Sequence, residues 1–142
     1  MTGVQTCALP ISLYDLALVY EPDNVQVLNN YSYYLSLRNE NLEKATQMSK
    51  KSNELSPENA SFQDTYAWIL YQKKEYELAK TWLIKAYENG GKLSPVITEH
   101  LGDVCFQLGD SNRALIYWGK AKKLGEGSKY LEQKIAEKTL YE

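Results

Sequence analysis

The sequence predicts an all-α solenoid, in which short pairs of helices stack side by side. One helical phrase recurs along the chain, over residues 30–55, 65–87 and 100–124. The alanine that opens the second half of each phrase stands at Ala45, Ala79 and Ala114, so the spacing is 34 and then 35 residues. Pro22 and Pro57 are likewise 35 residues apart. A helix pair of this length cannot bury its own apolar face and becomes stable only against neighbouring pairs.

The composition fits one short array and gives no sign of nucleic-acid binding. The chain has 142 residues, of which 44% are hydrophobic, enough to fill a core. Its net charge of −2 offers no basic face for a phosphate backbone. No apolar run approaches the roughly 18 residues that a membrane-spanning helix needs. We therefore expect neither a nucleic-acid partner nor insertion of this fragment into a membrane.

The helices are expected in a regular order from residue 13. The stretch 13–20 precedes Glu21 and Pro22, and proline after a helix marks its end, so we expect the second helix of a truncated repeat there. First helices are expected over residues 25–38, 59–73 and 95–108, and second helices over residues 42–55, 76–88 and 111–124. The expected units are a truncated repeat at 13–22, three repeats at 23–57, 58–93 and 94–126, and a capping helix at 127–142.

Local signals justify these boundaries. Helix starts are indicated by side-chain acceptors or a proline, at Asp23 or Asn24, Glu58 or Asn59, and Ser94 with Pro95. Helix ends are indicated by Gly90 and Gly125, because glycine takes a left-handed cap at little cost. Residues 128–142 form a different helix, whose thin apolar stripe of Leu131, Ile135 and Leu140 runs among lysines and glutamates. A terminal unit needs such a polar outer face, so we interpret it as a cap.

The first residues share no pattern with the rest of the chain. Residues 1–11, MTGVQTCALPI, resemble the in-frame translation of a short-read sequencing adapter, so we interpret residues 1–12 as a non-native tail on a metagenomic gene fragment. The native protein is then expected to be longer. Cys7 would not be a biological cysteine, which leaves Cys105 without a partner for an internal disulfide.

The repeated residues resemble the tetratricopeptide repeat (TPR), a helix-turn-helix unit of 34 residues. Its large-small pair in the first helix is matched by Tyr31-Ser32, Tyr66-Ala67 and Leu101-Gly102. Its alanine, large residue and final small residue in the second helix are matched by Ala79, Leu83 and Ala86, and by Ala114, Trp118 and Ala121. The resemblance implies a TPR α-solenoid of antiparallel helix pairs with a C-terminal capping helix. Ser49 and Ser52 depart from the pattern, so we expect the first unit to be the least stable.

Two further interpretations follow from the same residues. A unit of 35 residues could instead be a pentatricopeptide repeat that reads RNA, but the acidic balance argues against it. The phrase at residues 64–71, DTYAWILY, resembles a variant common in bacterial envelope-associated TPR proteins. We therefore expect a bacterial protein of the cell envelope or periplasm, with the cytoplasm as the alternative.

The resemblance implies that the first helices line a concave face that holds an extended peptide or a partner helix. The matching positions are Asn29, Tyr33, Leu37, Asp64, Trp68, Tyr71, Glu99, Asp103 and Phe106. These residues predict an acidic groove with aromatic platforms, suited to a basic or aromatic partner. The alternative is that some of the rings pack against a neighbouring helix and the acids form a solvated face.

No set of residues predicts catalysis, a metal site or a cofactor. His100 is the only histidine, and on a helix it lies about 100° from Glu99, so we interpret it as a surface or interface histidine. Cys105 falls in the apolar stripe and is expected to be a buried thiol.

We therefore expect a non-enzymatic scaffold or adaptor that binds a protein or peptide. The alternative is a regulatory or substrate-recruiting C-terminal tail of a larger enzyme. Self-association through an uncapped N-terminal edge is a third possibility.

Overall fold

The computed structural model describes residues 11–140, and every regular element within them is helical. The helices are α1 (Ile11–Tyr20), α2 (Val25–Leu37), α3 (Leu42–Leu55), α4 (Ala60–Gln72), α5 (Tyr76–Glu88), α6 (Pro95–Gln107), α7 (Ser111–Leu124) and α8 (Leu131–Glu137), with a short 3₁₀ turn η2 (Gly91–Leu93) before α6. From α2 to α7 each helix begins and ends within one residue of its predicted position. The adapter-like stretch lies almost wholly outside the described residues.

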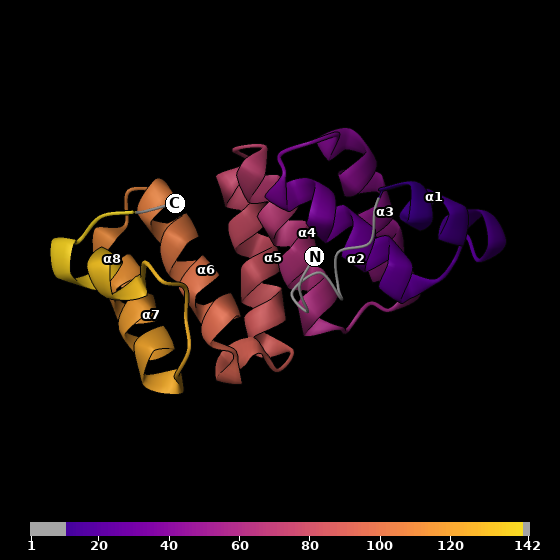
Figure 1. Cartoon of the computed structure of the whole chain (residues 1–142). Helices are drawn as coiled ribbons and strands as arrows, with labels where there is room; N and C mark the ends of the chain where they lie inside the picture. Colours follow the sequence, from indigo (N-terminus) through magenta and orange to yellow (C-terminus); the bar gives the residue numbers. More distant parts are fainter. Residues whose placement is uncertain (1–10, 141–142) are drawn as a thin grey trace.

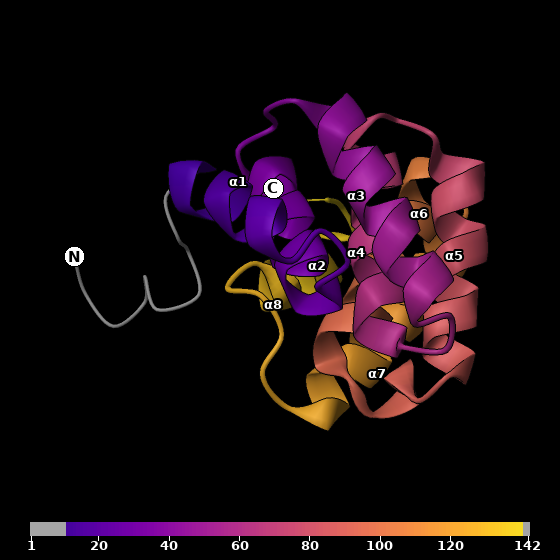
Figure 2. The same ribbon diagram turned by 90° about the vertical axis from the view of Figure 1, so that its right-hand side faces the viewer.

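The helices form a stack of antiparallel pairs. α2 packs on α3, α4 on α5 and α6 on α7, and each pair packs on the next. The stack runs from α1 at one end to α7 and α8 at the other (Figure 1). In the view turned by 90°, α3 and α5 lie on one side of the stack and α2 and α8 on the other (Figure 2). The first helices also pack on one another, α2 on α4 and α4 on α6, so they form one layer of the stack.

Side-chain caps fix the start of each first helix. Asn24 Oδ1 accepts a hydrogen bond from the backbone N–H of Val27 at 3.0 Å, and Asn59 Oδ1 accepts one from Phe62 at 3.1 Å. Of the two candidates that the sequence offered at each start, the structure uses the asparagine. Ser94 caps α6 in the same way. These bonds satisfy backbone amides that have no partner within the helix.

The turn inside each pair has, at the same position, a residue whose backbone is in the left-handed conformation. This residue is Asn39 with φ of 51°, Lys74 with φ of 65° and Gly109 with φ of 85°. The three positions are 35 residues apart. A left-handed residue reverses the chain over a few residues, which lets the second helix fold back along the first.

Small residues let the helices approach closely. Ala79, Ala114 and Ala121 are fully buried. At Gly102 an added Cβ would collide with the ring of Trp118, which α7 inserts into the same interface. The large-small pair of the sequence thus corresponds to a tight α6–α7 contact.

The first full pair has a more polar interior. Ser49 and Ser52 are fully buried where the next pair has Leu83 and Ala86. Ser52 donates a hydrogen bond to the carbonyl of Ser49, but the hydroxyl of Ser49 has no partner among the described residues. A buried hydroxyl without a partner is costly, so this pair gains less from its core than the others.

The capping helix differs from its prediction in length and in its buried face. A helix was expected over residues 128–142, but α8 ends at Glu137, because Lys138 takes a left-handed conformation with φ of 54°. Leu131 is buried, and Ile135 and Leu140 pack against the same cluster, as the apolar stripe predicted. Lys134, however, is buried with them instead of facing solvent.

Two glycines in the helices of the last pair provide a test of this packing. Gly102→Ala is expected to destabilise the fold by about 1–3 kcal/mol, because the new methyl group meets Trp118. Gly119 lies inside α7 with open space around an added Cβ, so Gly119→Ala should stabilise by about 0.5–1 kcal/mol through helix propensity. Urea unfolding followed by circular dichroism measures both changes. Equal effects of the two substitutions would contradict the close α6–α7 contact.

Candidate partner-binding groove

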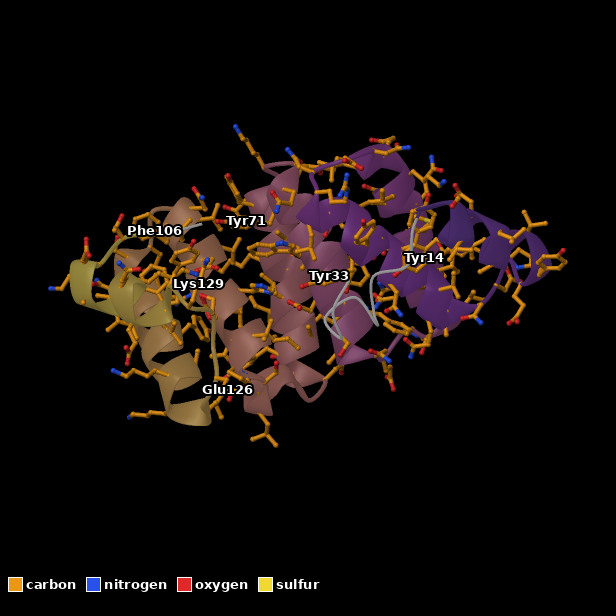
Figure 3. The ribbon with its side chains drawn as sticks, viewed as in Figure 1. Tyr14, Tyr33, Tyr71, Phe106, Glu126 and Lys129 are labelled. Atoms are coloured by element: carbon orange, nitrogen blue, oxygen red, sulfur yellow. The ribbon has the colours of Figure 1, made fainter. Side chains whose placement is uncertain are left out.

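The first helices α2, α4 and α6 line a groove that α8 and the loop before it close at one end. Its main cavity has a volume of about 570 Å³. Its walls are Tyr33 and Leu37 of α2, Trp68 of α4, Val96 of α6 and Tyr130 of the loop. A second cavity of about 340 Å³ adjoins it and shares Tyr33 and Val96. Figure 3 shows Tyr33 near the middle of the molecule, between the two ends of the stack.

The structure brings most of the predicted groove residues together. The main cavity is lined by Tyr33, Leu37, Trp68, Glu99 and Asp103, and the smaller one by Asn29, Tyr33 and Asp64.

Two of the predicted residues, Tyr71 and Phe106, line neither cavity: Tyr71 is buried in the core and Phe106 is partly buried against it. Tyr71 is 4% exposed and its ring stacks on Trp68 with centroids 4.5 Å apart. Phe106 stacks on Trp118 at 5.8 Å. Tyr71 also contacts Tyr76 of α5, with ring centroids 5.2 Å apart, and Figure 3 labels both Tyr71 and Phe106. These two rings thus contact neighbouring helices, Tyr71 on α5 and Phe106 on α7.

The acids of α6 face α8. Lys134 Nζ donates hydrogen bonds to Glu99 Oε2 at 2.6 Å and to Asp103 Oδ1 at 2.9 Å, and all three side chains are at most 5% exposed. Ser128 donates its backbone N–H to Glu99 Oε1 at 2.7 Å, and Trp118 Nε1 donates to Asp103 Oδ1 at 2.9 Å. The two carboxylates that the sequence placed in an open acidic groove are therefore paired beneath the capping helix.

This network shifts the pKa values of the two carboxyl groups in opposite directions. Burial alone would raise the pKa of Glu99, but the hydrogen bonds from Lys134 and Ser128 lower it below its usual value. Burial dominates at Asp103 and raises its pKa. Burial would lower the pKa of Lys134, yet the two carboxylates raise it, so the lysine stays charged. One lysine thus pairs with two acids whose pKa values shift in opposite directions.

Asp64 is also paired, across the α4–α6 interface. Its Oδ1 lies 2.8 Å from Nδ1 of His100, and both side chains are largely buried, at 13% and 15% exposed. The His100 ring stacks on Trp68 with centroids 4.1 Å apart and planes inclined by 17°. His100 is therefore an interface histidine that joins two first helices, and it lines the main cavity as well.

Opposing effects set the protonation of His100. Burial disfavours the charged ring and lowers its pKa, whereas the charge and hydrogen bond of Asp64 raise it. Asp103 and Glu99 add to this attraction. The pKa of His100 therefore lies above its ordinary value of 6.5.

Sequence reasoning missed the residues of α8 and its loop. Lys134, Ser128 and Tyr130 line the main cavity although they come from the predicted solvent-facing cap. A signal for Lys134 existed, because it lies three residues after Leu131 and directly before Ile135, on the apolar face of the helix. Val96 and His100 lie one helical turn apart on α6, and the sequence offered no pattern that selected them as a pair.

The described residues show no arrangement suited to metal chemistry or membrane crossing. Within residues 11–140, no group of three or more His, Cys, Asp or Glu side chains is placed to hold a metal ion. No helix in that range has the length and apolar character that a membrane span requires. Cys105 is a buried free thiol, and burial raises its pKa, which disfavours the reactive thiolate.

Comparison with known proteins gives matches of structure but not of sequence. No protein-family model matches the chain, and no curated protein sequence matches it. The crystal structure of MamA superimposes with a TM-score of 0.75 at 20% identity, covering 90% of this chain and 74% of MamA. TTC0263, a thermophilic TPR protein of Thermus thermophilus, superimposes with a TM-score of 0.77 at 16% identity, covering 95% of this chain and 74% of that protein. The fold is that of a TPR solenoid.

A third TPR-like neighbour comes from another bacterium. PilF of Pseudomonas aeruginosa superimposes with a TM-score of 0.75 at 23% identity, and the match covers 88% of this chain and 56% of PilF. At these identities the likeness establishes the TPR fold, as the repeat pattern predicted, and leaves the partner to be argued from side chains.

The Lys134 network predicts how firmly α8 is held. Lys134→Met leaves two buried carboxylates without their cation, so we expect a loss of about 3 kcal/mol or complete detachment of α8. Lys122→Met is the matched control. Lys122 of α7 also pairs with a carboxylate, that of Glu132 on α8 at 3.4 Å, but in an exposed position. That change should cost less than about 1 kcal/mol. Hydrogen exchange of the α8 amides and urea unfolding measure both, and equal protection in the two variants would contradict the network.

The Asp64–His100 pair predicts a raised pKa for His100, which the proton NMR signal of its ring can report. Because the chain has a single histidine, proton NMR of its ring gives the pKa directly, and we expect a value above 6.5 that falls in Asp64→Asn. The charged ring is the form that Asp64 stabilises. The contribution of the pair to the free energy of unfolding is therefore complete below about pH 6.5, the ordinary pKa of histidine. It is lost as the pH rises through the pKa of His100 in the folded state. A value at or below the ordinary one would contradict the ion pair.

Proposed function

We propose that this chain is a non-enzymatic interaction module that binds a peptide or partner helix in the groove formed by α2, α4 and α6. The observation that carries the proposal is the exposed apolar surface along this groove. Leu37 is 57% exposed, Val96 47% and Tyr33 40%, although each stands on the inner layer of helices. Apolar side chains gathered around a cavity are typical of binding sites, whereas scattered ones need no explanation.

The groove geometry fits an elongated ligand. Successive first helices contribute to both cavities, and the two cavities adjoin through Tyr33 and Val96. A peptide or helix that crosses the stack would therefore contact several units at once, which is how a solenoid makes an extended binding surface. The TPR fold supports protein binding in general terms.

The alternative role uses the same surface. As a recruiting tail of a larger enzyme, the chain would still capture its partner through the groove, and catalysis would belong to another domain. The experiment below tests the groove for either role.

A matched pair of substitutions tests the groove. Leu37 is 57% exposed inside the groove, and Ile116 is 56% exposed on α7, outside both cavities. Peptides are first selected from a random phage-displayed library on the wild-type chain, then labelled and measured by fluorescence polarisation. Leu37→Ser should weaken the selected peptides by at least about tenfold, because an apolar contact is lost. Ile116→Ser should leave their affinity unchanged.

Circular dichroism and thermal unfolding serve as the folding control for both variants. Equal binding by wild type, Leu37→Ser and Ile116→Ser would remove the groove hypothesis. A library from which no peptide is enriched would count against it as well.

A further inference from the structure

We infer that copies of this chain associate head to tail, with α1 of one copy bound by α7 of the next. The inference goes beyond the proposed function, because α1 and α7 lie towards opposite ends of the stack (Figure 1) and neither contributes to the cavities of the groove. It makes specific the self-association that the sequence left as a third possibility.

The helix α1 is apolar on two opposite sides. On its inner side Tyr14 is buried, and its ring stacks on Tyr31 of α2 with centroids 4.9 Å apart. Its outer side exposes four large apolar side chains, which are Leu13 at 46%, Leu16 at 50%, Val19 at 74% and Tyr20 at 78%. A helix that is apolar all round is normally covered on every side. The outer side of α1 therefore predicts a partner that covers it.

The two ends of the stack carry opposite charge, which identifies the partner. Residues 11–58, which form α1 to α3 and their turns, have seven acidic and four basic side chains. Residues 111–130, which form α7 and most of the loop after it, have five basic and one acidic side chain. Two identical ends repel each other, whereas two different ends attract. The contact is therefore expected to join different surfaces of the two copies.

Among the second helices α3, α5 and α7, only α7 exposes charges of a single sign. The exposed charged side chains of α3 and α5 are of both signs, namely Glu43, Lys50, Glu54, Glu77, Lys85 and Glu88. Those of α7 are all basic, namely Arg113, Lys120, Lys122 and Lys123. The spacing of Arg113, Lys120 and Lys123 by seven and three residues puts them on one side of the helix. This side is suited to an acidic partner.

The side chains of α1 and α7 also match in their apolar parts. Lysine packs its aliphatic stem along apolar surface while its charged end stays in water, so Lys120 and Lys123 can cover the leucines of α1. An ammonium group is also attracted to the face of an aromatic ring, and the ring of Tyr20 is open to solvent. A basic helix with long side chains therefore fits the outer side of α1.

The acids beside α1 complete the match. Residues 11–37 contain three acidic and no basic side chains. Asp15 and Asp23 pair with lysines of α3 at 2.7 Å and 2.6 Å. Glu21 instead accepts a hydrogen bond from the neutral amide of Asn24 at 2.9 Å, and this contact does not compensate its charge. A lysine of the second copy can therefore pair with Glu21 directly after the apolar side of α1.

The test measures the mass of the full chain in solution by sedimentation equilibrium over a range of concentrations. A reductant is present, because Cys7 can otherwise cross-link two copies. The average mass should rise past that of a dimer, since a head-to-tail contact leaves one unused surface at each end. Added salt should weaken the association, because it screens the attraction between the ends.

Two double variants, one for each surface, test which residues make the contact. Leu16→Gln with Val19→Gln removes apolar contacts from α1, and Lys120→Glu with Lys123→Glu reverses the charge of α7. Each pair should weaken association by at least about tenfold. A mixture of the two variants should form a dimer and nothing larger, because each supplies the surface that the other lacks.

Lys85→Glu with Lys92→Glu is the matched control. It makes the same change of charge on two exposed lysines between the ends of the stack, so association should stay as in the wild type. All six substituted side chains are exposed, and circular dichroism checks that the variants fold.

Three outcomes would overturn the inference. The wild-type chain may not stay a monomer up to about 1 mM, the α7 variant may not associate like the wild type, and the mixture may not remain monomeric. Association that needs α1 but ignores the charge reversal on α7 would instead indicate a contact between two identical ends.

Discussion

The buried contact of Lys134 with Glu99 and Asp103 is the constraint on which the character of the groove depends. A charged lysine below 5% exposure is stable only when its hydrogen-bonding partners are fixed, and two acids one turn apart on α6 provide them. The contact holds a helix of only seven residues on the end of the stack. It also makes the loop before α8 a wall of the main cavity and buries the carboxylates of Glu99 and Asp103.

The same principle operates at the α4–α6 interface with a weaker base. Asp64 and His100 join two first helices, and the stack of Tyr71, Trp68 and His100 continues the contact in aromatic rings. The polar groups of the groove floor thus pair with one another. The rim consists of the exposed apolar side chains Tyr33, Leu37 and Val96, which have no such partner among residues 11–140. Rigid, self-paired floors with apolar rims favour affinity from shape and burial over affinity from charge.

The repeat determined how much the sequence could predict. Helix positions could be predicted from the 34- to 35-residue period. The signals that set them, such as caps and the small residue Gly102, depend on contacts within one helix pair or between adjacent pairs. The partners of Glu99, Asp103 and Asp64 could not be predicted, because they lie 31 to 36 residues away and on other helices. Periodicity identifies which face a side chain occupies, but not which charge meets it across an interface. Lys134 shows the difference, because its place on the apolar face was readable while its two partners were not.

The left-handed turn residues carry a further consequence. Asn39, Lys74 and Gly109 adopt similar backbone angles at the same place in successive pairs, although their side chains have nothing in common. For glycine this conformation is unstrained, whereas for lysine it costs on the order of 1 kcal/mol. The turn between α4 and α5 therefore holds its angle because the packed helices on both sides impose it. At these turns the 35-residue period is therefore visible in the backbone φ angles, although the amino acids at the three positions differ.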